Sequence, residues 1–120
     1  MTQYKDFFSL SHEVKLYVPS TQGLSGRIDT AQHAKRVKEV AEKMASLFGG
    51  ATTTQAQGYY VAGNGSLVVE DIEIVYSGST TEAWEQASQT LLDYTQEKCR
   101  EWDQESIILE YDGKKYFIKK

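Results

Sequence analysis

The chain has 120 residues, of which 40% are hydrophobic and 25% are charged, with one proline and one cysteine. This length and composition are typical of one globular domain, residues 1–120, and exclude a disordered or low-complexity protein. The net charge of −4 argues against nucleic acid as a partner, and a lone Cys99 excludes an internal disulfide. No apolar run resembles a signal peptide or reaches the roughly 20 residues of a membrane span, so we expect a cytoplasmic protein.

The first strand is predicted at VKLYVPS, residues 14–20. Residues 1–12 are expected to form an N-terminal arm, with the folded core at 13–120. The strand ends at Pro19, which lacks a backbone N–H donor. Its alternation places three apolar side chains on one buried face: Val14, Leu16 and Val18.

A loop rich in Ser, Thr and Gly is expected over residues 20–28. Arg27 in this loop stands just before a helix, where free N–H groups and a guanidinium are able to hold an anion. The loop lacks the glycine and lysine spacing of a phosphate-binding loop, so a plain connector is the simpler interpretation.

The clearest helix is predicted over residues 29–50. Asp29 or Thr30 is suited to accept from the free N–H groups of the first turn. Gly49 is suited to the left-handed conformation that ends a helix. Three- and four-residue spacing gives one apolar face: Val37, Val40, Ala41, Met44, Leu47 and Phe48.

A hairpin is predicted around the turn at Gly63, Asn64 and Gly65. A two-residue turn at Asn64-Gly65 would put two glutamines in the core, so we prefer the three-residue turn that pairs Ala62 with Ser66. In this register the core face is expected to hold Thr54, Ala56, Gly58, Tyr60, Val68, Glu70, Ile72 and Ile74. The opposite, open face is expected to hold Tyr59, Val61, Leu67, Val69, Asp71 and Glu73.

A second helix is predicted over residues 79–102, with Ser79 and Glu82 as a capping box. Its apolar stripe contains Trp84, Ala87, Ser88, Leu91, Thr95, Cys99 and Trp102. Residues 105–120 are expected to form a hairpin at Asp112-Gly113 that pairs Leu109 with Tyr116, Ile107 with Ile118 and Ile108 with Phe117.

The order of elements predicts an α+β fold, a ferredoxin-like βαββαβ plait with an extra C-terminal strand. In this fold an antiparallel sheet carries two helices on one face. The uncovered face would present Tyr59, Val61, Leu67 and Val69, with Tyr17, Ile108 and Phe117 as candidates to join them. An apolar open face favours a homodimer or higher homo-oligomer. The alternative is that the arm covers it with Tyr4, Phe7, Phe8 and Leu10.

Groups suited to catalysis are few. His33 and Cys99 form a possible nucleophilic pair, but a cysteine on an apolar helix stripe is more often a core residue. Two histidines and one cysteine do not supply the ligand spacing of a metal site. Asp71 and Glu73 are a possible acid/base or metal pair, or else the solvated side of a strand. Glu70, predicted on the core face, requires a partner and is a candidate site residue.

Four segments carry a family resemblance: Lys15–Thr21, Leu47–Thr54, Ala56–Val61 and Gly65–Tyr76. They read K-x-Y-V-P-S-T, L-F-G-G-A-T-T-T, A-x-G-Y-Y-V and G-x-L-V-x-E-x-I-x-I-V-Y. In these motifs the chain resembles a group of small ferredoxin-like proteins found in prokaryotic genomes, phages and mobile elements. The resemblance implies the fold and a phage or mobile-element context inside a host cell, and it supplies no catalytic residue.

The resulting hypothesis is a non-enzymatic binding protein that counters host defence by binding a host protein or by sequestering a nucleotide signal. Tyr59, Tyr60 and Trp84 would stack on a base, and Arg27, Lys35 or Arg36 would pair with phosphate. The candidate binding residues are Tyr59, Val61, Leu67, Val69, Phe117, Glu70, Arg27 and Trp84; no cofactor, metal ligand or catalytic residue is predicted. The alternative is a small dimeric enzyme or small-molecule-binding plait with a carboxylate-containing pocket, and a nucleic-acid-binding plait is disfavoured by the acidic charge.

Overall fold

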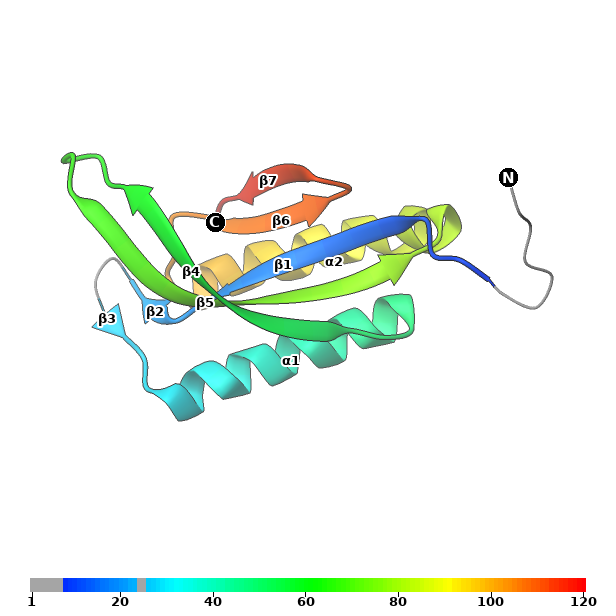
Figure 1. The fold of residues 1–120 in the computed structure, drawn as a ribbon, viewed down its shortest axis with the longest axis horizontal. Helices are drawn as coiled ribbons and strands as arrows, with labels where there is room; N and C mark the ends of the chain where they lie inside the picture. Colours follow the sequence, from blue (N-terminus) through cyan, green and yellow to red (C-terminus); the bar gives the residue numbers. More distant parts are fainter. Residues whose placement is uncertain (1–7, 24–25) are drawn as a thin grey trace.

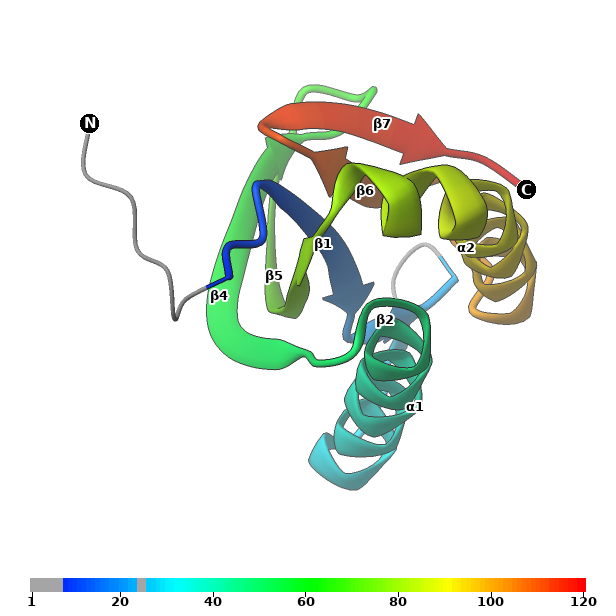
Figure 2. The same cartoon turned by 90° about the vertical axis from the view of Figure 1, so that its right-hand side faces the viewer.

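A computed structural model describes residues 8–23 and 26–120. Its elements are β1 (His12–Pro19), β2 (Thr21–Gln22), β3 (Gly26–Arg27), α1 (Thr30–Phe48), β4 (Thr52–Val61), β5 (Leu67–Ser79), α2 (Thr81–Glu101), β6 (Ile107–Tyr111) and β7 (Lys114–Ile118). Five strands form one antiparallel sheet in the order β4-β5-β1-β6-β7, and both helices lie on one face of it (Figures 1 and 2). The predicted α+β plait is confirmed. No helix in the described part of the chain is long and apolar enough to cross a membrane.

The core lies between the sheet and the two helices, and β1 is its central strand. Leu16 pairs with Val75 of β5 on one side and with Leu109 of β6 on the other, and all three are buried. The predicted alternation of β1 is therefore confirmed. The helices complete the core with a set of buried side chains that includes Val37, Val40, Met44, Leu91, Cys99 and Trp102.

The helix ends follow the predicted capping with one correction. Asp29 caps α1 and accepts from the backbone N–H of Gln32, and Gly49 ends this helix in the left-handed conformation at φ 95°. Helix α2 is capped by Thr80, whose hydroxyl accepts from Ala83 N–H, and not by Ser79. Ser79 is the last residue of β5, because the strand runs further than its apolar alternation indicated.

Both predicted hairpin registers are confirmed. Ala62 N–H donates to the Ser66 carbonyl at 2.8 Å across the three-residue turn, and Val61 pairs with Leu67. In the C-terminal hairpin, Ile107 pairs with Ile118 and Leu109 with Tyr116. The loop predicted over 20–28 contains one further short ribbon, the pair β2 and β3.

The predicted core face of the β4–β5 hairpin is wrong. Pairing with β1 places Val75, Ser77 and Ser79 on the helix side, and all three are buried. Ile72 and Ile74 consequently face away from the helices, whereas Asp71 and Glu73 face them. The error arose because β5 carries apolar residues on both faces, so apolar alternation alone does not choose between them.

Tyr60 is not the core residue that the sequence predicted. The β4–β5 hairpin projects past the helices (Figure 1), and Tyr60 is 51% exposed while Tyr59 is 64% exposed. Strand alternation still separates the two rings onto opposite faces of the hairpin. Helical cover ends before the strand reaches either ring, so neither is packed in the core.

Replacing Tyr59 or Tyr60 by alanine is therefore expected to lower the free energy of unfolding of the isolated chain by less than about 1 kcal/mol. A buried aromatic would cost about 3–5 kcal/mol. Urea denaturation of the two variants beside the wild-type protein measures this directly. A loss above about 2 kcal/mol for Tyr60→Ala alone would place its ring in a packed core.

The open face of the sheet carries a polar cluster at β1 and β6, where the sequence predicted an apolar surface. The hydroxyl of Tyr17 donates to Glu110 at 2.8 Å, and Lys15 lies 3.7 Å from the same carboxylate. Partial burial, followed by the bond to Glu110, raises the pKa of Tyr17 to about 12, so the phenol stays protonated. The arm proposed as a cover is described only in part: Phe8 is exposed, Leu10 contacts Gly78, and residues 1–7, including Tyr4 and Phe7, lie outside the described residues.

Candidate functional site

The predicted apolar cluster does not form one surface. Tyr59, Val61, Leu67 and Val69 share one face at the tip of the β4–β5 hairpin, and all are exposed. Phe117 is also exposed, but it lies on β7, at the opposite edge of the sheet. Tyr17 and Ile108 lie on the open face, away from the helix side. The structure thus keeps the four hairpin residues together and separates the other three from them.

Trp84 and Arg27 lie at opposite ends of β1 and do not share a site. The Trp84 ring stacks on Tyr111 at 4.0 Å between centroids and lies 6.5 Å from Phe48, so its faces are already occupied. Tyr111 pairs beside the start of β1, whereas Arg27 follows its end. An eight-residue strand is about 25 Å long, so the structure does not bring these two predicted binding residues together.

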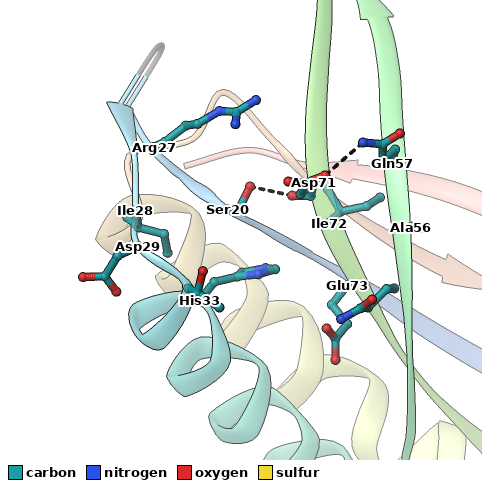
Figure 3. A pocket seen from close by; sticks show the side chains of 12 residues that line it. Ser20, Arg27, Ile28, Asp29, His33, Ala56, Gln57, Asp71, Ile72 and Glu73 are labelled. Carbon is teal, nitrogen blue, oxygen red and sulfur yellow. Dashed lines mark hydrogen bonds between the residues drawn. The ribbon is translucent and has the colours of Figure 1, made fainter.

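A groove of about 770 Å³ lies between the first turn of α1, the β2–β3 ribbon and strands β4 and β5 (Figure 3). Its charged and polar lining includes Arg27, Asp29, His33, Gln57, Asp71 and Glu73. Gln57 donates to the Asp71 carboxylate at 3.1 Å, and the hydroxyl of Tyr59 donates to Gln57 at 3.2 Å. Tyr59 is thereby joined to the groove, although it is not one of its lining residues.

Glu70 lies on the other face of β5 from Asp71, and it is only 8% exposed. One carboxylate oxygen, Oε1, accepts from the Ser20 backbone N–H at 3.1 Å and from the Thr21 hydroxyl at 2.9 Å. These donors supply the partner that a buried carboxylate requires. Within the described residues, both donors bind Oε1, and no donor binds the second carboxylate oxygen, Oε2. Glu70 is thus held at one oxygen by two donors from the segment that follows β1.

Ser20 links Glu70 to the groove. Its backbone N–H donates to Glu70, while its hydroxyl donates to the Asp71 carbonyl at 2.5 Å (Figure 3). The segment after β1 therefore fixes β5 at the point where carboxylates project to both faces. We call this region the hairpin base, defined as Ser20, Thr21, Glu70, Asp71 and Glu73.

Tyr60 is the aromatic residue beside Glu70. Partial burial raises the pKa of Tyr60, and the charges of Glu70 and Glu105 raise it further. Its hydroxyl consequently remains a hydrogen-bond donor at neutral pH, near two carboxylates. Because half of the residue is exposed, its ring is also available for stacking.

The proposed Cys99 and His33 pair is not formed. Cys99 is fully buried, its thiol donates to the Gln104 carbonyl at 3.2 Å, and burial raises its pKa. His33 Nε2 donates instead to the Val18 carbonyl at 3.2 Å. In the ranges 8–23 and 26–120, no three His, Cys, Asp or Glu side chains are grouped as a metal site requires.

Sequence reasoning identified Glu70 but missed the residues that hold it. Ser20 and Thr21 were assigned to a connector, and Arg36 to phosphate binding. Arg36 is 8% exposed, and it donates to the carbonyls of Pro19 and Thr21 and to the Gln22 side chain, so it is committed to this segment. The only signal in the sequence was a glutamate inside an apolar alternation, which predicts a partner without identifying it.

Comparison of the fold with solved structures finds two similar chains, both of a phage SAM lyase. The one in complex with S-methyl-5′-thioadenosine has a TM-score of 0.61 at 17% identity, and the match covers 99% of this chain and 97% of that one. The apo structure has a TM-score of 0.58 at 18% identity, covering 91% and 89%. No family model matches the sequence, and no curated protein matches it either.

These neighbours confirm the fold and agree with the predicted phage context, while no family match supports the particular group that the motifs resemble. They contradict the hypothesis of a non-enzymatic binding protein that blocks a host protein or sequesters a nucleotide, because both neighbours are an enzyme. The alternative hypothesis, a small enzyme or small-molecule-binding plait with a carboxylate-containing pocket, is the one that they favour.

Proposed function

We propose that this chain is a lyase that cleaves S-adenosylmethionine (SAM) and releases S-methyl-5′-thioadenosine, with Glu70 as its catalytic carboxylate. The observation that carries the proposal is a buried glutamate held at one carboxylate oxygen by two donors, in a fold that matches a SAM lyase from end to end. Tyr59 and Tyr60 supply exposed rings on which an adenine is able to stack.

The reaction breaks the bond between the sulfonium sulfur and the γ-carbon of the methionine part, and the bonding electrons go to sulfur. A lyase adds no water, so the four-carbon fragment has two routes. Its own carboxylate attacks the γ-carbon and forms a lactone, or a β-proton is lost and an alkene forms. Both routes balance without an external oxidant or cofactor.

The role of Glu70 follows from the change in charge. A carboxylate that only neutralised the sulfonium would stabilise the substrate more than the transition state, because the positive charge on sulfur disappears as the bond breaks. Glu70 is therefore assigned to the four-carbon part. It either binds the α-ammonium and orients the substrate carboxylate for attack, or accepts the β-proton.

The test is incubation of the purified chain with SAM, followed by chromatography for S-methyl-5′-thioadenosine and NMR of the four-carbon product. Release of the thioadenosine is expected, and a lactone or an alkene identifies the route. A chain that leaves SAM intact overturns the proposed function. Because its substrate is a cytoplasmic metabolite, the enzyme would act in the host cytoplasm and deprive SAM-dependent host enzymes of their substrate.

We further propose that the chain forms a homodimer or higher homo-oligomer through the β4–β5 hairpin. The exposed side chains Tyr59, Val61, Leu67 and Val69 support this proposal, as does the position of β4 at an edge of the sheet. A second copy would cover both the apolar surface and the unpaired backbone of this strand.

Leu67→Glu is expected to convert the oligomer into a monomer, because it places a charge within the apolar surface. Sedimentation or native mass spectrometry measures the change, with Phe117→Glu at the other edge of the sheet as the matched control. A wild-type monomer at every concentration tested, or equal dissociation by both variants, contradicts this role for the hairpin.

A further inference from the structure

We propose that Arg36 is a positioning residue for Glu70, and that it acts through the four-residue strap Pro19–Gln22. The inference rests on the proposed function, and it assigns a role to a residue that does not touch the carboxylate. Arg36 lies on α1, on the helix side of the sheet, and is 8% exposed.

The guanidinium of Arg36 binds the strap at three acceptors. Nη1 donates to the carbonyls of Pro19 at 3.0 Å and Thr21 at 2.7 Å, and Nη2 donates to the side-chain oxygen of Gln22 at 2.7 Å. The guanidinium also stacks on the Trp102 ring at 4.8 Å. A planar fork that reaches three acceptors and stacks at the same time is specific to arginine.

The same strap supplies both donors to Glu70. The N–H of Ser20 and the hydroxyl of Thr21 lie between the carbonyls that Arg36 holds, so their direction is set by the backbone that Arg36 fixes. Gln104 adds a second support, because its side-chain amide donates to the Thr21 carbonyl at 3.0 Å. Arg36 thus determines where Oε1 of Glu70 is held and where Oε2 points.

Among residues 8–23 and 26–120, no carboxylate is in direct contact with the guanidinium of Arg36. Its three acceptors are neutral, and burial lowers its pKa, opposed by the charges of Glu101 and Glu70. Leaving a buried guanidinium without a directly paired anion is costly. We infer that the three hydrogen bonds to the strap, together with the nearby charge of Glu70, compensate the cost of burying Arg36.

The first test is Arg36→Lys, with Arg100→Lys on the exposed surface of α2 as the matched control. Lysine keeps the charge, but its single nitrogen cannot span the three acceptors as the planar guanidinium does, so kcat for SAM is expected to fall at least about tenfold with little change in KM. The control is expected to keep the wild-type kcat. Added guanidinium is expected to restore part of the activity of Arg36→Ala, which a loss of general stability would not allow.

The second test avoids α1 and addresses the strap directly. Thr21→Val removes one donor to Glu70 at almost constant volume, and it is expected to lower kcat in the same way, whereas Thr21→Ser keeps the hydroxyl and the activity. Full kcat in both Arg36→Lys and Thr21→Val overturns the positioning role and leaves the proposed function intact. A wild-type chain that releases no thioadenosine overturns the proposed function, and the role of Arg36 falls with it.

Discussion

Replacing Glu70 by glutamine is expected to reduce the rate of SAM cleavage at least about a hundredfold. The glutamine side-chain oxygen still accepts from Ser20 N–H and the Thr21 hydroxyl, so the strap keeps its place. The substitution removes the negative charge of the side chain. The neutral amide that replaces it binds the substrate ammonium less strongly and does not accept a proton. Initial rates of thioadenosine release at saturating and limiting SAM measure the effect on kcat and on kcat/KM.

The matched control is Glu42→Gln, which removes one negative charge from the exposed surface of α1. It is expected to leave the rate unchanged, and thermal melts of both variants separate a lost function from a lost fold. If Glu70→Gln retains the wild-type rate, catalysis belongs to the other carboxylates of the hairpin base. Asp71→Asn and Glu73→Gln then decide between them.

The elements with strong local signals were predictable from the sequence. Asp29 and Gly49 delimit α1 as their capping chemistry requires, and the glycine at position 65 fixes the three-residue turn, with φ at 86°. The face of β5 was not predictable, because it is determined by pairing with β1, a contact between segments about 60 residues apart. The predicted register of the β4–β5 hairpin paired the correct residues, but the prediction placed the wrong face of the hairpin against the helices.

Of the candidate site, only the need of Glu70 for a partner was predictable. Glu70 was identified because a carboxylate amid apolar residues must have a partner. Its donors come from the strap, and the strap is held by Arg36 from a helix on the other side of the sheet. These contacts connect segments that are distant in the sequence, and no local pattern in the residues encodes them.

The scarcity of nucleophiles led to the wrong expectation about catalysis. A sulfonium already carries a good leaving group, so its cleavage requires orientation of the substrate, with one base in the alkene route, and no activated cysteine or serine. Under the proposed reaction, a chain whose one cysteine is buried in the core has all the groups that the chemistry requires. The number of conventional catalytic groups is therefore a weak argument against an enzyme whose substrate is itself reactive.

The largest effect on stability is expected for Leu16→Ala, which should lower the free energy of unfolding by about 3 kcal/mol. Leu16 is 1% exposed on the central strand and packs between Val75 and Leu109, so the cavity has well-ordered walls on both sides. Urea denaturation measures the loss, with Lys38→Ala on the exposed side of α1 expected to stay within about 0.5 kcal/mol of wild type. A small loss for Leu16→Ala would mean that β1 is not the central strand. Because β1 leads directly into the strap that holds Glu70, that result would also remove the structural basis for the proposed site.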